Sequence, residues 1–156
     1  MEFKNEYCYV PESSDCRVES LTHGRHTDVS DITMIAMPIN ITNTHWVCGV
    51  INIATQTVEI WDSFDVGNEV VEKIGDAMIL WIEDVRKEKL LTPIKFQFKK
   101  HTAPRQTNAY DCGVYALLCM QATLRGLEKT YGKDEAKLFR QTMQQGIQDH
   151  AVRPRL

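Results

Sequence analysis

The sequence contains no long uncharged apolar run, and no charged start followed by an apolar stretch. A membrane span needs about 20 consecutive apolar residues and a signal peptide needs that charged start, so we expect neither in this chain. Lysine and arginine form no extended block, and a net charge of −3 leaves no basic footprint for nucleic acid. We therefore predict a protein that binds neither membranes nor nucleic acid.

Cysteine is present, but not in a pattern that favours disulfides. The five cysteines are an odd number at irregular spacing, which fits reduced thiols in a reducing compartment. We expect an intracellular protein of the nucleus or cytoplasm, or of the host cell cytosol for an effector or viral protein. Zinc-type ligands do occur in one short segment, but seven residues separate its two cysteines, which is too wide for a zinc knuckle. Those ligands are Cys8, Cys16, His23 and His26. We predict no metal and no cofactor.

The length and composition describe one ordinary domain. The chain has 156 residues, of which 43% are hydrophobic and 25% charged, so it can bury a core of its own. It shows no internal repeat and no low-complexity segment. We expect a single domain over residues 1–156, and a monomer.

Three short apolar runs predict the strands of a mainly antiparallel sheet. Residues 32–39 read as a buried strand, and residues 46–53 and 57–61 are rich in β-branched side chains. Only three residues separate the last two runs, which predicts an antiparallel hairpin. This hairpin would place His45 and Asp62 at neighbouring points on one edge of the sheet.

Helical spacing of apolar residues alternates with these strands, which predicts an α+β fold. The first helix is expected over residues 68–90, with an apolar face made of Val70, Val71, Ile74, Met78, Trp81, Ile82 and Val85. A half-exposed strand at 94–99 and a loop at 101–110 should follow. A further helix is expected over residues 134–148, with a weaker stripe of Ala136, Leu138, Phe139, Met143 and Ile147.

The segment around Cys112 carries the strongest chemical signal. Asp111 suits an N-cap, Cys112 falls in the first turn of an apolar helix, and Gly126 suits its stop. A helix N-terminus favours a thiolate over a thiol, so position alone would activate Cys112. His45 is the candidate base, held by Asp62, and the Gln106 amide is a candidate donor to an oxyanion.

Each of these residues also has an ordinary structural explanation. A cysteine in a buried helix is commonly a small core residue, as we expect for Cys119 on the same helix. His101 and His150 are rivals for the base, but His101 lies at a strand end across a proline-containing loop and His150 lies in the C-terminal tail. It is the coincidence of a thiol, a histidine, an aspartate and a glutamine that favours catalysis.

The pattern resembles the ubiquitin-like-protease family, the SUMO (sentrin)-specific and related deconjugating cysteine proteases, to which adenovirus proteases are distantly similar. The similarity covers roughly residues 32–125. It consists of a His-Trp pair after a strand and a proline-containing turn, a strand ending in Asp-Ser, and a glutamine placed before Asp-Cys-Gly. In this sequence these are Pro38, His45-Trp46, Trp61-Asp62-Ser63, Gln106, Asn108 and Asp111-Cys112-Gly113. The order His, Asp, Cys is the reverse of the papain type, in which cysteine comes first.

The resemblance implies a papain-like or adenain-like fold and a role for each matched residue. Cys112 would be the nucleophile, His45 the base, Asp62 its orienter and Gln106 the oxyanion donor. Substrate contacts would come from Trp46, Asn108, Asp111 and Gly113, with Trp46 forming part of a narrow tunnel for a Gly-Gly tail. The implied partner is a ubiquitin-like modifier, of the SUMO type, or its conjugates.

The chain departs from the family pattern at its N-terminal side. Family domains carry a longer N-terminal lobe with a second tunnel tryptophan, whereas 44 residues precede His45 and none is tryptophan. Two alternatives therefore stay open beside the peptidase. The same thiol can pass an acetyl group to a side chain or cofactor, and a silent copy of the fold can bind a ubiquitin-like protein without cleaving it.

Overall fold

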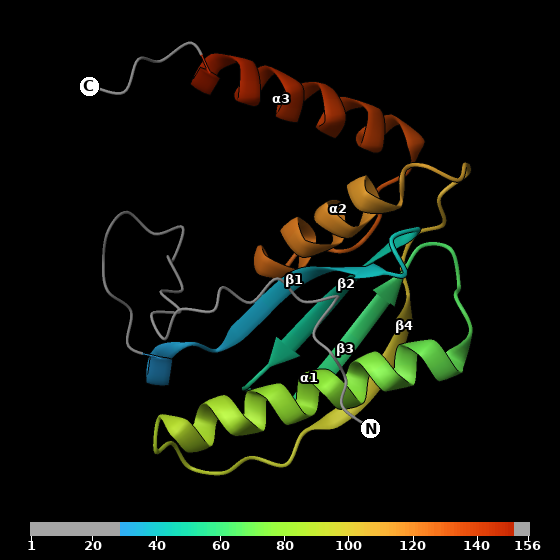
Figure 1. The fold of residues 1–156 in the computed structure, drawn as a ribbon. Helices are drawn as coiled ribbons and strands as arrows, with labels where there is room; N and C mark the ends of the chain where they lie inside the picture. Colours follow the sequence, from blue (N-terminus) through green and yellow to red (C-terminus); the bar gives the residue numbers. More distant parts are fainter. Residues whose placement is uncertain (1–28, 152–156) are drawn as a thin grey trace.

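The computed structural model describes residues 29–151, which form one sheet flanked by helices (Figure 1). The four strands lie in the order β1-β2-β3-β4. They are β1 (Met34–Ile41), β2 (His45–Asn52), β3 (Thr57–Asp62) and β4 (Gln97–Thr102). The helices are the short 3-10 helix η1 (Val29–Asp31), α1 (Asn68–Glu88), α2 (Cys112–Leu124) and α3 (Lys133–Ala151). The predicted α+β class is confirmed.

The sheet is mixed, with two antiparallel pairs and one parallel pair. β1 and β3 each run antiparallel to β2, which confirms the predicted hairpin. β4 runs parallel to β3, because the chain crosses over through α1 between them. The first connection is tight: Thr44 N donates to Ile41 O at 3.1 Å, and both Thr42 and Asn43 have positive φ. Since a β-branched residue such as Thr42 rarely adopts positive φ, this turn before His45 is strained.

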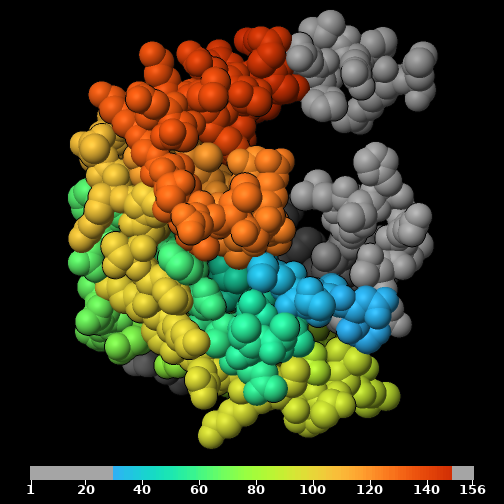
Figure 2. Space-filling model, turned by 180° about the vertical axis from the view of Figure 1, so that it is seen from behind, coloured from blue at the N-terminus to red at the C-terminus, as the bar shows by residue number. Residues whose placement is uncertain are grey.

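The molecule has four layers (Figure 1). α1 covers one face of the sheet and α2 covers the other, and α3 lies on the far side of α2. Figure 2 shows α3 in red along the outer side of α2. Because both faces are covered, β2 reads as a continuous apolar run rather than an alternating one.

Side-chain alternation in the sheet decides which face each site residue takes. Odd-numbered residues of β2, such as Val47 and Ile51, pack with Ile60 of β3 in the cluster under α1. Cys48 and Val50 instead pack with α2 in a second cluster. His45 and Asp62 continue the first set, and Trp46 continues the second, since successive side chains of a strand point to opposite faces.

Several predicted boundaries differ from the structure. The fourth strand begins at Gln97 instead of residue 94 and includes His101, because its register is set by pairing with β3 from Thr57↔Gln97 to Asp62↔Thr102. The first strand is likewise shifted to residues 34–41 by its pairing with β2. α1 ends at Glu88 rather than at residue 90, where φ is already +54°. The local pattern of apolar residues cannot predict these registers, because they are set by pairing with strands elsewhere in the chain.

The predicted apolar faces of two helices were too wide. In α1, Val71, Met78 and Ile82 are buried, but Val70 and Trp81 are each 40% exposed. In α3, Ala136 is buried whereas Leu138 is 63% exposed. A helix packed against a single layer buries only a narrow stripe. Within residues 29–151, no helix combines the length and apolarity that crossing a membrane requires.

Candidate active site

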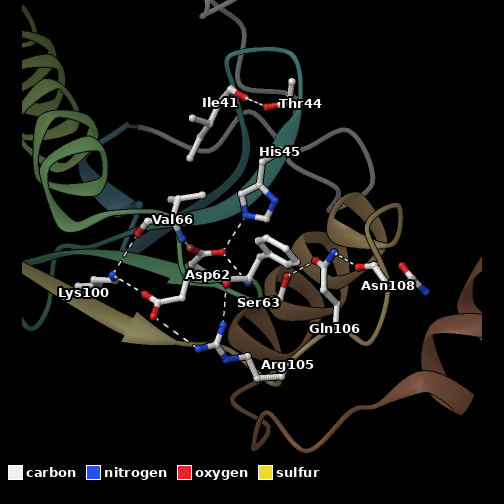
Figure 3. A network of polar contacts seen from close by, with 12 residues as sticks. Ile41, Thr44, His45, Asp62, Ser63, Val66, Lys100, Arg105, Gln106 and Asn108 are labelled. Carbon is white, nitrogen blue, oxygen red and sulfur yellow. Dashed lines mark hydrogen bonds and ion pairs between the residues drawn. The ribbon is translucent and has the colours of Figure 1, made fainter.

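His45 and Asp62 form a buried pair where β2 begins and β3 ends. The imidazole Nε2 lies 2.8 Å from Asp62 Oδ1, and the residues are 8% and 1% exposed. The pairing arises because the β2–β3 hairpin brings these two strand ends to one edge of the sheet, on one face. The predicted base and its predicted orienter are therefore in direct contact (Figure 3).

The surroundings of Asp62 fix the tautomer of His45. Phe64 N donates to Asp62 Oδ1 at 2.9 Å, and Val66 N donates to Oδ2 at 2.6 Å. A carboxylate only accepts hydrogen bonds, so the 2.8 Å contact requires a proton on His45 Nε2. In the neutral ring, Nδ1 then holds the free lone pair and is the nitrogen that can take a proton.

The loop that supplies these N–H groups is anchored from β4. Lys100 Nζ donates to Asp65 Oδ1 and to Asn68 Oδ1, both at 2.8 Å. Arg105 donates to the Phe64 carbonyl at 2.7 Å. These contacts hold the turn that wraps the Asp62 carboxylate, and Figure 3 shows Lys100 and Arg105 beside this turn.

Gln106 is tied to the strand that carries Asp62. Ser63 Oγ donates to Gln106 Oε1 at 2.7 Å, and Gln106 Nε2 donates to the Asn108 carbonyl at 2.6 Å. The carbonyl is a pure acceptor, so the amide nitrogen must face it, and this fixes the orientation of the amide. A primary amide has two N–H groups, and the second one remains for another acceptor.

Asp111 precedes the helix as predicted, but its side chain does not cap it. Asp111 occupies the N-cap position without a side-chain hydrogen bond to the helix. Its Oδ2 accepts from Asn108 Nδ2 at 2.6 Å, and its Oδ1 accepts from Arg140 on α3. The hydrogen bond from Asn108 lowers the pKa of Asp111 below its ordinary value, and Arg140 lowers it further against the opposing effect of desolvation. The two partners outcompete the helix for this carboxylate.

Cys112 is the first residue of α2 and opens onto a groove of about 820 Å³. Trp46 and Gly113 line the same groove, which continues between α2 and α3 past Leu117 and Met143. Trp46 is 39% exposed, and a Cβ added to Gly113 would lie 3.6 Å from the indole Cδ1. The Cys112 thiol and Trp46, which follows His45 in the chain, therefore line the same cavity. The N–H groups in the first turn of α2 have no partner within the helix.

The predicted site residues fall into three connected groups. His45 and Asp62 are bonded directly, and Cys112, Trp46 and Gly113 line the groove. A polar chain runs between these two groups and consists of Gln106, Asn108 and Asp111. None of these three is among the described residues that line the groove. Direct substrate contact by Asn108 and Asp111 stays a prediction.

The competing residues lie elsewhere. Cys48 and Cys119 are 0% exposed in the core under α2, where a hydrogen bond between the two thiols and burial raise the pKa of Cys48. His101 stacks on Trp61 at 4.1 Å, away from the groove. Cys8, Cys16, His23 and His26 lie outside the described residues. Within the described part, no cluster of three or more potential metal ligands occurs.

Comparison with known proteins gives this geometry a family. Residues 5–155 match the C-terminal catalytic domain of the Ulp1 protease family. The chain belongs to the Ulp1 protease family. It is 30% identical over 116 residues to the ubiquitin-like-specific protease 1A of Arabidopsis thaliana, a match that covers 72% of this chain and 22% of that protein.

Solved structures of Ulp1-type catalytic domains share the fold. One is the C-terminal Ulp1 protease domain in complex with Smt3, the yeast ortholog of SUMO, with 25% identity, a TM-score of 0.62, and coverage of 73% of this chain and 51% of that one. Another is the Ulp1-like SUMO protease catalytic domain of Chaetomium thermophilum, with 28% identity, a TM-score of 0.59, and coverage of 72% and 44%. This chain spans about half the length of those Ulp1 domains, or less.

Two residues of this Ulp1-family site were not singled out from the sequence. Ser63 was seen only as part of the Asp-Ser motif, although its direct adjacency to Asp62 was a signal that it shares the site. Arg140 carries no local signal, because it lies 29 positions beyond its partner Asp111 on another helix. Only the packing of α3 on α2 brings it to the site.

Proposed function

We propose that this chain is a cysteine peptidase of the Ulp1 type that cleaves after the C-terminal Gly-Gly of a SUMO-type ubiquitin-like modifier. The observation that carries the proposal is the buried 2.8 Å bond between His45 Nε2 and Asp62 Oδ1, beside a groove that begins at a helix N-terminal thiol. That bond leaves His45 Nδ1 free to exchange a proton, which a merely structural histidine does not require.

The first step is attack by the Cys112 thiolate on the carbonyl carbon of the last glycine. The sulfur forms a bond to carbon, and the electron pair of the C=O bond moves to oxygen. His45 holds the thiol proton on Nδ1 and is then an imidazolium, whose charge is balanced by Asp62. Burial of the pair strengthens this interaction relative to water.

The oxyanion that forms needs donors already in place. The second N–H of Gln106 Nε2 is one, since the first is used by the Asn108 carbonyl. The backbone N–H of Cys112, free at the helix start, is another. Ser63 fixes the opposite side of the amide, so little reorganisation is needed when charge develops.

Collapse of the tetrahedral adduct breaks the bond to the leaving amine, which takes the proton from His45 Nδ1. A thioester between Cys112 and the modifier remains. His45 then takes a proton from water, which attacks the thioester, and the products are a free carboxyl terminus and the thiol. No cofactor enters these steps.

A Gly-Gly tail fits what lies around Cys112. Gly113 and Trp46 both line the groove beside Cys112, and a Cβ added to Gly113 would already stand 3.6 Å from the indole Cδ1, so little free space is left at this point. Residues without side chains pass such a constriction most easily. The Ulp1 domain bound to Smt3 supports a SUMO-type modifier as the partner. An intracellular location, in nucleus or cytosol, goes with this proposal.

The two alternatives have less support. The relatives and structures described above are named as proteases, and none is named an acetyltransferase. A silent binding module would have no need to keep the tautomer of His45 fixed by three hydrogen bonds to Asp62.

The test is covalent capture by modifiers that carry a C-terminal electrophile. Ubiquitin and SUMO types are mixed with wild type, Cys112→Ala and Cys119→Ala, and adducts are detected by intact mass. We expect an adduct with a SUMO type for wild type and for Cys119→Ala, which loses a buried thiol of the same helix, and none for Cys112→Ala.

The other results assign the protein differently. An adduct with ubiquitin alone would contradict the SUMO-type substrate and keep the mechanism. Absence of any adduct, together with selective iodoacetamide labelling of Cys112, would indicate an acyl substrate of another class. Absence of both would favour the binding module.

A further inference from the structure

A continuous chain of hydrogen bonds links α3 to the strand that carries Asp62. It starts at Arg140, whose guanidinium donates to Asp111 Oδ1, and Asp111 Oδ2 accepts from Asn108 at 2.6 Å. Asn108 in turn accepts from Gln106 through its carbonyl at 2.6 Å, and Gln106 accepts from Ser63 at 2.7 Å. Figure 3 shows the last part of this chain, from Asn108 through Gln106 to Ser63.

Asn108 holds the loop rigid between the two ends. Its side-chain oxygen accepts from the backbone N–H groups of Tyr110 at 3.1 Å and Asp111 at 2.9 Å. Every polar atom of the Asn108 side chain is thereby engaged within the segment that leads to Cys112. A displacement of Asp111 is therefore transmitted to the carbonyl that orients the Gln106 amide.

Arg140 also gives the groove a positive charge. Among the described residues that line the groove, it is the only one with a charged side chain. The other titratable groups near Cys112 are Asp111, directly before it, and Tyr110, which lines the same groove. His45 and Asp62 form their own buried pair outside the described lining. β1, which also packs on α2, has no charged residue. The Asp111 carboxylate thus stands one residue from the thiol, with Arg140 as its counter-charge.

We propose that Arg140 is a positioning residue of this site: it neutralises Asp111 beside the Cys112 thiolate and, through Asp111 and Asn108, holds the Gln106 amide in place. The part that concerns Gln106 rests on the proposed function, whereas the charge balance does not. Without Arg140, an unpaired negative charge next to Cys112 opposes formation of the thiolate. The loop also loses the anchor that joins it to α3.

The charge balance is tested without any modifier. The rate of iodoacetamide alkylation of Cys112 is followed by peptide mass from about pH 5 to about pH 9. We expect Arg140→Met to move the half-maximal rate upward by about half a pH unit, and Arg140→Lys to move it less. Adding Asp111→Asn to Arg140→Met should restore the wild-type profile. Lys137→Met, which removes an exposed cation from the same helix, is the matched control and should change nothing.

Two labelling results would overturn the proposal. One is an Arg140→Met profile equal to that of wild type. The other is an equal shift in Arg140→Met with and without Asp111→Asn, which would mean that α3 acts through packing alone. Thermal melting of each variant establishes that it is folded. If Arg140→Met does not fold, the shift measured for Arg140→Lys still decides the test.

The effect on Gln106 is tested by turnover of the modifier identified above. We expect Arg140→Met to lower kcat about tenfold, less than the loss of an oxyanion donor itself, and to change KM less than about twofold. A rise in KM with unchanged kcat would contradict positioning and make Arg140 a substrate contact. If wild type cleaves no modifier, the proposed function fails, while the labelling result still decides the role of Arg140.

Discussion

At the scale of single residues, the hydrogen-bond acceptors of the site fix the orientation of the groups that donate to them. Asp62 accepts one imidazole N–H and two backbone N–H groups, and the Asn108 carbonyl accepts the Gln106 amide. Because these acceptors cannot donate, each partner has one allowed orientation. The same side chains with an amide in place of the carboxylate would lose that definition.

Asp62→Asn is predicted to be folded but nearly inactive. An uncharged amide at this position no longer balances the imidazolium. Its NH₂ group must stand either at the Oδ2 position, against the Val66 N–H, or at the Oδ1 position, against the Phe64 N–H and His45 Nε2, and the second arrangement moves the imidazole proton to Nδ1, where it blocks the base. We expect kcat to fall by a factor on the order of 10² to 10⁴. Steady-state kinetics with a cleavable form of the modifier that forms the covalent adduct measure kcat.

Asp76→Asn is the control for that substitution, since it removes an exposed carboxylate from α1 with the same chemical change. Equal activity of Asp62→Asn and wild type would refute the assignment of Asp62 as the orienter of His45.

At the scale of elements, the site depends on how closely the helices approach the sheet. α1 contacts β4, the strand whose Lys100 anchors the loop around Asp62, and Gly75 is the residue that permits the contact. A Cβ at Gly75 would lie 2.3 Å from Phe98 Cδ2, closer than real contacts allow. The glycine is thus required by packing and not by backbone conformation.

Gly75→Ala is predicted to destabilise the fold. Overpacking costs about 1–3 kcal/mol, and the better helix propensity of alanine returns up to about 1 kcal/mol, so we expect a net loss of about 1–2 kcal/mol in the free energy of unfolding. Urea denaturation measures it. Gly146→Ala in α3, where a Cβ meets nothing within 4 Å, should be neutral or stabilising. Equal effects of the two changes would mean that Phe98 moves aside without cost.

At the scale of the whole molecule, three segments far apart in sequence build the candidate active site. The β2–β3 hairpin supplies the His–Asp pair, the loop before α2 and the start of that helix supply the glutamine and the thiol, and α3 supplies Arg140. The carboxylates among these contacts bind cations or N–H donors, so the assembly depends on their ionisation.

Stability is predicted to fall in acid through Asp111 and Asp65. Both pKa values lie below the ordinary 3.8. The main cause is the hydrogen bond from Asn108 for Asp111 and the hydrogen bond from Lys100 for Asp65. A lowered pKa in the folded state means that the stabilisation is present above the unfolded value and is lost as pH falls through the folded value. The loss should therefore appear below about pH 4.

Urea midpoints of wild type and Asp111→Asn at neutral pH and in acid measure this effect. The difference between the two pH values should be smaller in Asp111→Asn by less than about 1 kcal/mol, since Arg140 is 53% exposed and its pairing is screened. A variant with the same pH dependence as wild type would contradict a contribution from Asp111.

Local sequence patterns are enough to predict the elements, the hairpin and the identity of the chemical groups. Apolar periodicity located α1 and α2, and the run between His45 and Asp62 folds locally, so their pairing could be predicted from strand ends alone. The start of α2 at Cys112 likewise follows from local pattern. These features depend on interactions over a few residues, which a linear reading contains.

Features that depend on long-range packing became visible in the folded structure alone. The parallel register of β4, the exposure of Leu138, the turning of Asp111 from helix cap to partner of Arg140, and the link from Ser63 to Gln106 each join residues distant in the chain. A side chain such as Asp111 has several competing donors, and which one it binds is set by where α3 packs. That choice is a property of the folded whole and is written in no short stretch of sequence.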